Sequence, residues 1–112
     1  MRTDLERIGD IFQAIDRSQD YYTHLFDEAY DIRMVLDALQ YNILVIGEAA
    51  NHLSPVITES IPNIKWDSVT GMRNMLAHEY FGVDMDIVVR TVENDLPDLK
   101  IALEKYVSEP EQ

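Results

Sequence analysis

The sequence predicts an all-α protein. Apolar residues recur every three or four positions along most of the 112-residue chain, which is the period of a helix with one buried face. No segment alternates apolar and polar residues for long enough to indicate a β-sheet. Pro55 and Pro62 mark an interruption of the helical period. We therefore expect one domain, residues 1–112, built as an antiparallel bundle of four or five helices.

The first expected helix covers residues 3–22. Thr3 followed by Glu6 three residues later forms a capping-box signature, in which each side chain bonds the backbone N–H of the other residue. The apolar stripe that follows defines the expected core face. Its members are Leu5, Ile8, Phe12, Ile15 and Tyr22.

The second expected helix covers residues 27–53, begins near Asp27 and carries two adjoining apolar stripes. A helix that is apolar over so wide an arc is either central in its own core or shared with a partner chain, and the sequence leaves both open. The first stripe comprises Ile32, Leu36, Leu39, Ile43, Ile46, Ala50 and Leu53. The second comprises Tyr30, Met34, Ala38, Tyr41, Val45 and Ala49.

A loop with at most short turns is expected before the third helix, which covers residues 67–79. Asp67 is a plausible N-cap of this helix, and Gly82 supplies its stop.

The fourth expected helix covers residues 84–107 and has Asp84 as its cap. Pro97 lies within its apolar stripe, and an unrelieved interior proline costs about 3 kcal/mol, so the helix should kink or restart there.

Composition limits the functions that the chain can have. The absence of cysteine excludes disulfides and thiolate metal sites, and no segment has the apolar length of a membrane span. The N-terminus has no signal-peptide pattern, so we expect a soluble cytoplasmic protein. A net charge of −12 argues against a general basic surface for nucleic acid. Any nucleic-acid role must therefore be local, and residues 61–80 are the neutral part of the chain.

Polar side chains gather on the third expected helix, in the segment RNMLAHEYFGVD. At about 100° per residue, the apolar residues of this helix form one face and Asn74 and His78 lie together on the opposite side. Arg73 lies on the flank between the two faces. A solvated helix back is one interpretation, and a working site is the other.

The neighbours of His78 are informative, because Gly71 and Met75 would allow another surface to approach closely, although spacing alone does not decide between the two interpretations. A two-fold axis beside this helix would bring two copies of Arg73, Asn74 and His78 into one cleft. One imidazole could then accept a proton from a ribose 2′-hydroxyl while the other protonates the leaving oxygen.

The roles of three other polar residues stay open in the sequence. Glu48 is either a partner of Arg73 or an exposed residue, and His24 and His52 are expected at the surface with no constellation around them. No cluster has the spacing of metal ligands and no glycine-rich phosphate loop is present, so we expect neither a metal nor a cofactor.

Four segments together resemble the HepT-like family of the HEPN superfamily over nearly the whole chain: IGEAANHLS, IPNIKW, GMRNMLAHEYFGVD and NDLPDL. The most specific element is R-x-x-x-x-H-x-Y, which is Arg73, His78 and Tyr80 here. Asn74 occupies the polar position that commonly follows the arginine.

This resemblance implies a homodimeric helical bundle whose motif helices meet near the dimer axis. It also implies the toxin of a two-gene toxin–antitoxin module, a metal-independent ribonuclease acting on transfer RNA or messenger RNA, with Arg73, Asn74 and His78 as its catalytic residues. The implied partner is a small nucleotidyltransferase antitoxin of the MntA type, which uses ATP to transfer AMP to the motif tyrosine, here Tyr80. This chain itself would bind no cofactor.

Two alternatives to a ribonuclease remain at this point. The first is a non-catalytic dimeric module that binds a nucleotidyltransferase or a nucleotide. The second is a purely structural dimer, in which alanine at Arg73 and His78 has no effect.

Overall fold

The computed structural model describes residues 2–78 and 84–108, and all regular structure within those ranges is helical. The predicted all-α class is therefore confirmed. The elements in chain order are α1 (Asp4–Tyr22), α2 (Ile32–Asn51), α3 (Pro55–Ser60), α4 (Trp66–His78), α5 (Met85–Arg90), the π-helical turn η2 (Thr91–Asp95) and α6 (Leu96–Ser108).

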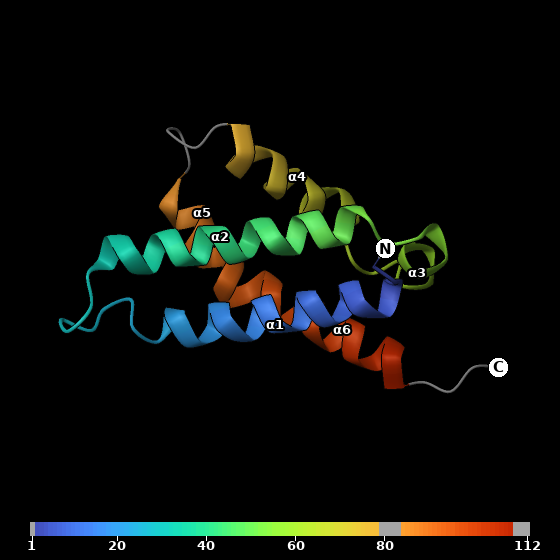
Figure 1. The fold of residues 1–112 in the computed structure, drawn as a ribbon, viewed down its shortest axis with the longest axis horizontal. Helices are drawn as coiled ribbons and strands as arrows, with labels where there is room; N and C mark the ends of the chain where they lie inside the picture. The colour runs from blue at the N-terminus through green and yellow to red at the C-terminus, as the bar shows by residue number, and fades with distance from the viewer. Residues whose placement is uncertain (1, 79–83, 109–112) are drawn as a thin grey trace.

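Helix α2 is the centre of the arrangement. It runs antiparallel to α1 on one side and packs against α4 on the other, while α6 lies along α1 (Figure 1). Its buried residues include Leu39, Ile43 and Ile46. The wide apolar arc of α2 is thus explained by its central place in the core of its own chain, which was one of the two possibilities that the sequence left open. Part of the second stripe nevertheless faces solvent: Met34 is 71% exposed and Tyr41 is 64% exposed.

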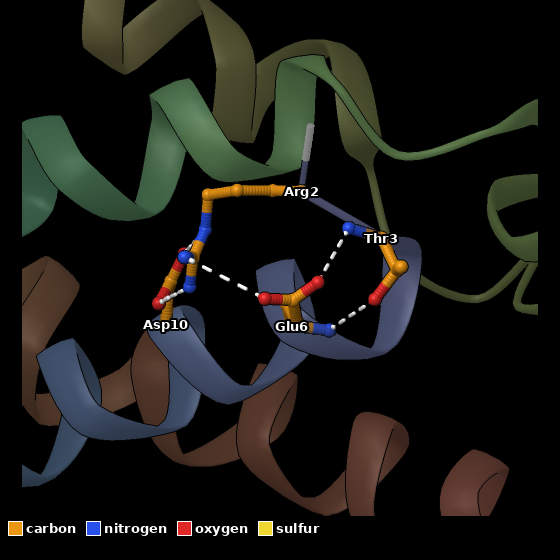
Figure 2. Close-up of polar contacts among 4 residues, drawn as sticks. All are labelled: Arg2, Thr3, Glu6 and Asp10. Carbon is orange, nitrogen blue, oxygen red and sulfur yellow. Dashed lines mark hydrogen bonds and ion pairs between the residues drawn. The ribbon is translucent and has the colours of Figure 1, made fainter.

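The N-terminus of α1 forms the predicted capping box. The Thr3 side chain accepts a bond from the Glu6 N–H, and the Glu6 carboxylate accepts one from the Thr3 N–H, both at 3.1 Å (Figure 2). Arg2 folds back over this turn and pairs with Asp10 and Glu6. The two bonds of the capping box satisfy N–H groups that the first turn of a helix leaves without intrahelical acceptors.

Helix α2 begins at Ile32 rather than near Asp27. The Asp31 side chain accepts a bond from the Arg33 N–H and is the N-cap, whereas Asp27 accepts from the Ala29 N–H in the preceding turns. Both aspartates are suitable for capping, so the sequence could not choose between them. His24 stacks on Tyr30 within these turns, with ring centroids 4.2 Å apart.

The segment between α2 and α4 is more ordered than expected. It contains the short helix α3, which has Pro55 at its start and is anchored by Trp66. The indole N–H of Trp66 donates to the carbonyl oxygens of Thr58 and Ile61, both at 3.1 Å. A side chain of the next helix thus bonds the carbonyl groups at the C-terminal end of α3. No pattern within the segment itself predicts this contact.

Helix α4 begins at Trp66, so the prediction that Asp67 caps it is wrong. The Lys65 carbonyl accepts the first helical bonds, from the N–H groups of Ser68 and Val69, which places Asp67 inside the first turn. An acidic residue there still interacts favourably with the positive end of the helix dipole. The predicted stop at Gly82 lies outside the described residues.

The predicted fourth helix is divided by a π-helical turn just before Pro97. Asp84 caps α5 as predicted, accepting a bond from the Asp86 N–H. The Leu96 N–H then bonds the Thr91 carbonyl five residues back, so the register of acceptors shifts by one. Pro97 has no N–H and would crowd the carbonyl four residues before it in a regular helix. The helix restarts at Leu96, which is the break that the proline predicted.

No helix of the described residues is both long and apolar enough to cross a membrane.

One side-chain contact ties the start of α1 to the start of α3, and it predicts a pH-dependent loss of stability. The Asp4 carboxylate accepts bonds from the Ser54 hydroxyl at 2.7 Å and the Ser54 N–H at 3.1 Å. The hydroxyl bond, followed by the backbone bond, lowers the pKa of Asp4 below its ordinary value. A depressed pKa stabilises the fold above the unfolded-state pKa, and this contribution is lost as pH falls through the folded-state pKa.

We therefore expect Asp4→Asn to be less stable than the unchanged protein at neutral pH, with the difference shrinking as pH falls below about 4. Urea unfolding at several pH values measures this difference. The matched control is Asp20→Asn, because the Asp20 side chain accepts no hydrogen bond from the described residues. A pH-independent difference for Asp4→Asn would contradict the assignment.

Candidate active site

The candidate site is built where α2 and α4 cross, and Gly47 is the reason that they cross closely. A Cβ atom at Gly47 would overlap the Cβ of Arg73 and lie 3.1 Å from the Val69 carbonyl oxygen. The only residue that fits between the two helices here is one without a side chain. The close approach places residue 48 of α2 directly beside residue 73 of α4.

A carboxylate and an arginine meet at this crossing. Glu48 Oε2 accepts a bond from Arg73 Nε at 2.7 Å, and Arg73 Nη1 donates to Asn74 Oδ1 at 2.8 Å. The sequence left Glu48 as either a partner of Arg73 or an exposed residue without one, and the structure shows that it is a partner of Arg73. The arginine therefore lies across the flank of α4 between the core side and the exposed side, where Asn74 lies.

His52 joins the same group from the C-terminal end of α2. Its Nε2 atom is 3.0 Å from Glu48 Oε1, so the two carboxylate oxygens are divided between His52 and Arg73. The expectation that His52 has no constellation around it is wrong. Its four-residue spacing from Glu48 on one helix was the available signal, because such residues are neighbours on a helix surface. We call Glu48, His52, Arg73 and Asn74 the Glu48–Arg73 cluster.

The cluster lies at the surface and not in a cavity. Side-chain exposure is 33% for Arg73 and 45% for Glu48, so both are open to a large ligand. A hollow of about 440 Å³ lies beside α4 and is lined by other residues, including Ile46, Met72 and Leu99. Arg73 is not among its lining residues. The cluster is therefore accessible from solvent and does not enclose a small molecule.

Of the remaining motif residues, His78 lies within the described part of the chain and Tyr80 does not. His78 is the last residue of α4, one helical turn after Asn74, which puts the two positions on the same side of the helix. Tyr80 lies outside the described residues. His24 lies in the turns before α2, stacked on Tyr30 and 3.9 Å from Asp27, and belongs to no part of the cluster.

Gly71 faces away from the core on the same helix. A Cβ atom built at Gly71 would meet nothing within 4 Å, which is open space beside the motif side of α4. The two glycines near the arginine thus differ in kind, because Gly47 is required by packing inside the chain and Gly71 is not.

Fold and site together define a class: an all-α protein that carries an arginine, an asparagine and a histidine along one partly exposed helix. The model of the family described as Ribonuclease HepT-like matches residues 11–106, which include every residue of the Glu48–Arg73 cluster. The chain therefore belongs to the HepT-like ribonuclease family, and the predicted resemblance is confirmed.

Individual relatives agree with this membership. A "Probable ribonuclease HepT" of Thermococcus cleftensis is 30% identical over 105 residues, covering 93% of this chain and 96% of the relative. The "Putative RNase MJ0125" of Methanocaldococcus jannaschii is 29% identical over 106 residues, covering 91% of each chain. The "Putative RNase MJ1380" of the same organism is 32% identical over 79 residues, covering 70% of this chain and 72% of the relative. No solved structure matches the chain.

The close crossing predicts the effect of adding one methyl group. Gly47→Ala should lower the free energy of unfolding by about 1–3 kcal/mol, because the new Cβ meets helix backbone that cannot rotate away. The matched control is Gly9→Ala on α1, which fills open space on a helix and should be neutral or stabilising by up to about 1 kcal/mol. Urea unfolding distinguishes them, and equal stability of the two variants would contradict the role assigned to Gly47.

Proposed function

We propose that this chain is the toxin of a two-gene toxin–antitoxin module and cleaves RNA as a metal-independent endoribonuclease in the cytoplasm. The observation that carries the proposal is the arginine of the family motif held in place at the surface, with Asn74 bonded to it and His78 one turn further along the same helix. Membership of the HepT-like ribonuclease family supports the same activity. Transfer RNA and messenger RNA are the proposed substrates.

In the proposed mechanism His78 moves the protons. One imidazole takes the proton of a ribose 2′-hydroxyl, which attacks the adjacent phosphorus, and a second imidazole protonates the leaving 5′-oxygen. The Arg73 guanidinium stabilises the additional negative charge on the phosphate oxygens, and Asn74 orients the phosphate or the imidazole. These steps need acid–base and electrostatic catalysis from side chains alone, so we propose no metal and no cofactor for this chain.

The second imidazole is supplied by a second copy of the chain. In the proposed homodimer the two α4 helices face one another near the two-fold axis, so that each contributes Arg73, Asn74 and His78 to one cleft. Open space around Gly71 and the partial exposure of Met75 support this arrangement, because they allow another surface to come close. Pairing of two arginines would also concentrate positive potential in a protein whose net charge is −12.

Regulation is proposed to act on Tyr80. A nucleotidyltransferase antitoxin of the MntA type would transfer AMP from ATP to its hydroxyl, two residues after His78. The adenylate adds bulk and a negative phosphodiester beside the motif, which would neutralise the cationic cleft and repel RNA.

The second candidate is a non-catalytic dimeric module that binds the nucleotidyltransferase or a nucleotide. The acidic character of the chain favours it, since a net charge of −12 opposes RNA binding outside a locally positive cleft. Expression of the chain alone separates the two candidates, because only a nuclease should arrest growth without its antitoxin.

Removal of the proposed acid–base group should abolish cleavage. We expect His78→Ala to lower cleavage of labelled transfer RNA in EDTA by about 100-fold or more, with an unchanged thermal midpoint, because proton transfer typically contributes that much. His24→Ala is the matched control, since His24 lies outside the cluster. Full activity of a folded His78→Ala protein would refute the mechanism, and no cleavage by the unchanged protein would favour the binding module.

Removal of the proposed modification site should prevent silencing. We expect Tyr80→Phe to retain ribonuclease activity after incubation with the cognate nucleotidyltransferase and ATP, whereas the unchanged protein gains the mass of AMP and loses activity. Tyr41→Phe is the control, because Tyr41 is exposed on α2 and lies outside the motif. Mass spectrometry and the cleavage assay measure both effects, and equal AMP incorporation into Tyr80→Phe would exclude Tyr80 as the acceptor.

A further inference from the structure

Glu48 holds the motif arginine by a particular atom. Its Oε2 accepts the bond from Nε of Arg73 at 2.7 Å, and not from either terminal nitrogen. A guanidinium is planar and carries five N–H donors, so a bond at Nε leaves the donors of the two terminal nitrogens, Nη1 and Nη2, for other partners. Nη1 donates to Asn74, and Nη2 has no hydrogen-bond partner among the described residues.

Two anchor points therefore fix the plane of the guanidinium. The Nε bond to Glu48 and the Nη1 bond to Asn74 lie on different sides of the group, so rotation about its last side-chain bonds breaks at least one of them. An anion that approaches Nη2 meets donors that are already oriented. Such preorganisation matters for catalysis, because donors fixed before charge develops need no reorganisation in the transition state.

Glu48 is itself fixed by its surroundings. The adjacent Gly47 brings the backbone of α2 against Arg73, and His52 bonds the second carboxylate oxygen at 3.0 Å. The Glu48 carboxylate is therefore close to Arg73, and its two bonds define its orientation. An ion pair with partners exposed to this degree adds little to folding stability, so stability does not account for the arrangement.

We propose that Glu48 is a positioning residue of the ribonuclease site, acting through Arg73 and not by contact with RNA. This inference rests on the proposed function and adds to it a residue outside the R-x-x-x-x-H-x-Y motif. The carboxylate orients the guanidinium so that Nη2 can donate to the scissile phosphate, while His52 bonds the other oxygen of the carboxylate.

A positioning role and a simple countercharge have opposite consequences for RNA. If Glu48 only neutralised Arg73, its removal would strengthen RNA binding and leave turnover intact or improved, because one negative charge is lost near the phosphates. If Glu48 orients Arg73, its removal lowers kcat even though binding is unchanged or tighter. The separation of kcat from binding is therefore the informative measurement.

The experiment uses the full chain and a short synthetic RNA that the unchanged protein cleaves, with its 2′-O-methyl analogue as the uncleavable probe for binding. We expect Glu48→Gln to lower kcat by about 10-fold to 100-fold without weakening binding of the analogue, as a small misplacement of a catalytic group does. Glu48→Asp, which keeps the charge, should recover part of the loss. Asp37→Asn is the matched control, an exposed carboxylate on the same helix that should leave kcat unchanged.

Dependence on Arg73 is tested by combining substitutions. In an Arg73→Ala background, Glu48→Gln should cause no further loss of kcat, because a residue that acts through the arginine has nothing left to orient. An additive loss, or a kcat of Glu48→Gln equal to that of the Asp37→Asn control, would overturn the inference while the ribonuclease itself stands.

A readout that needs no cleavage separates this inference from the function on which it rests. The Arg73 Nε–H proton, assigned by its disappearance in Arg73→Lys, should exchange slowly with water in the NMR spectrum of the unchanged protein and rapidly in Glu48→Gln. The same exchange rate in both would overturn the inference. Slow exchange in a protein that cleaves no RNA would instead overturn the proposed function and, with it, the catalytic part of the inference.

Discussion

The close crossing of α2 and α4 at Gly47 is the constraint on which the rest of the candidate site depends. Because Gly47 has no side chain, the backbone of α2 reaches the Cβ of Arg73, and the next residue, Glu48, faces the guanidinium at hydrogen-bonding distance. A larger residue at position 47 would separate the helices and lengthen the bond between Glu48 and Arg73, which is the contact of the cluster that joins α2 to α4. One small residue in the core thus decides the geometry of a polar group at the surface.

Helix α2 serves both the core and the site along its length. Its apolar side packs on α1 and α4, while its C-terminal turns supply Glu48 and His52 to the cluster. The buried polar side chains near it, such as Asn42, bond carbonyl oxygens of their own helix and do not compete for the cluster. The packed side of α2 therefore acts as a rigid support for side chains that must keep a fixed orientation.

The acidic composition and the proposed substrate are compatible only if positive charge is local. The net charge is −12, yet Arg73 lies in the part of the chain where acidic and basic residues balance. Glu48 offsets the charge of Arg73 and bonds its Nε atom. In the proposed mechanism this arrangement favours stabilisation of a transition state over tight binding of RNA, because it relies on a few oriented donors and not on a broad basic surface.

Much of this protein was determined by local sequence patterns. The helical class follows from the apolar period, the caps at Thr3 and Asp84 from residue type, and the break near Pro97 from its missing N–H. The family follows from the resemblance of four segments, among them the one that contains the R-x-x-x-x-H-x-Y motif. Residue type alone gave the wrong helix start at Asp27 and the wrong cap at Asp67. Asp31 caps α2 instead, and the Lys65 carbonyl accepts the first hydrogen bonds of α4. Only the tertiary structure decided that Glu48 binds Arg73, the contact that the sequence left as one of two alternatives. Residues 48 and 73 lie on different helices, and the distance between them is set by packing at Gly47, which no pattern within either helix records.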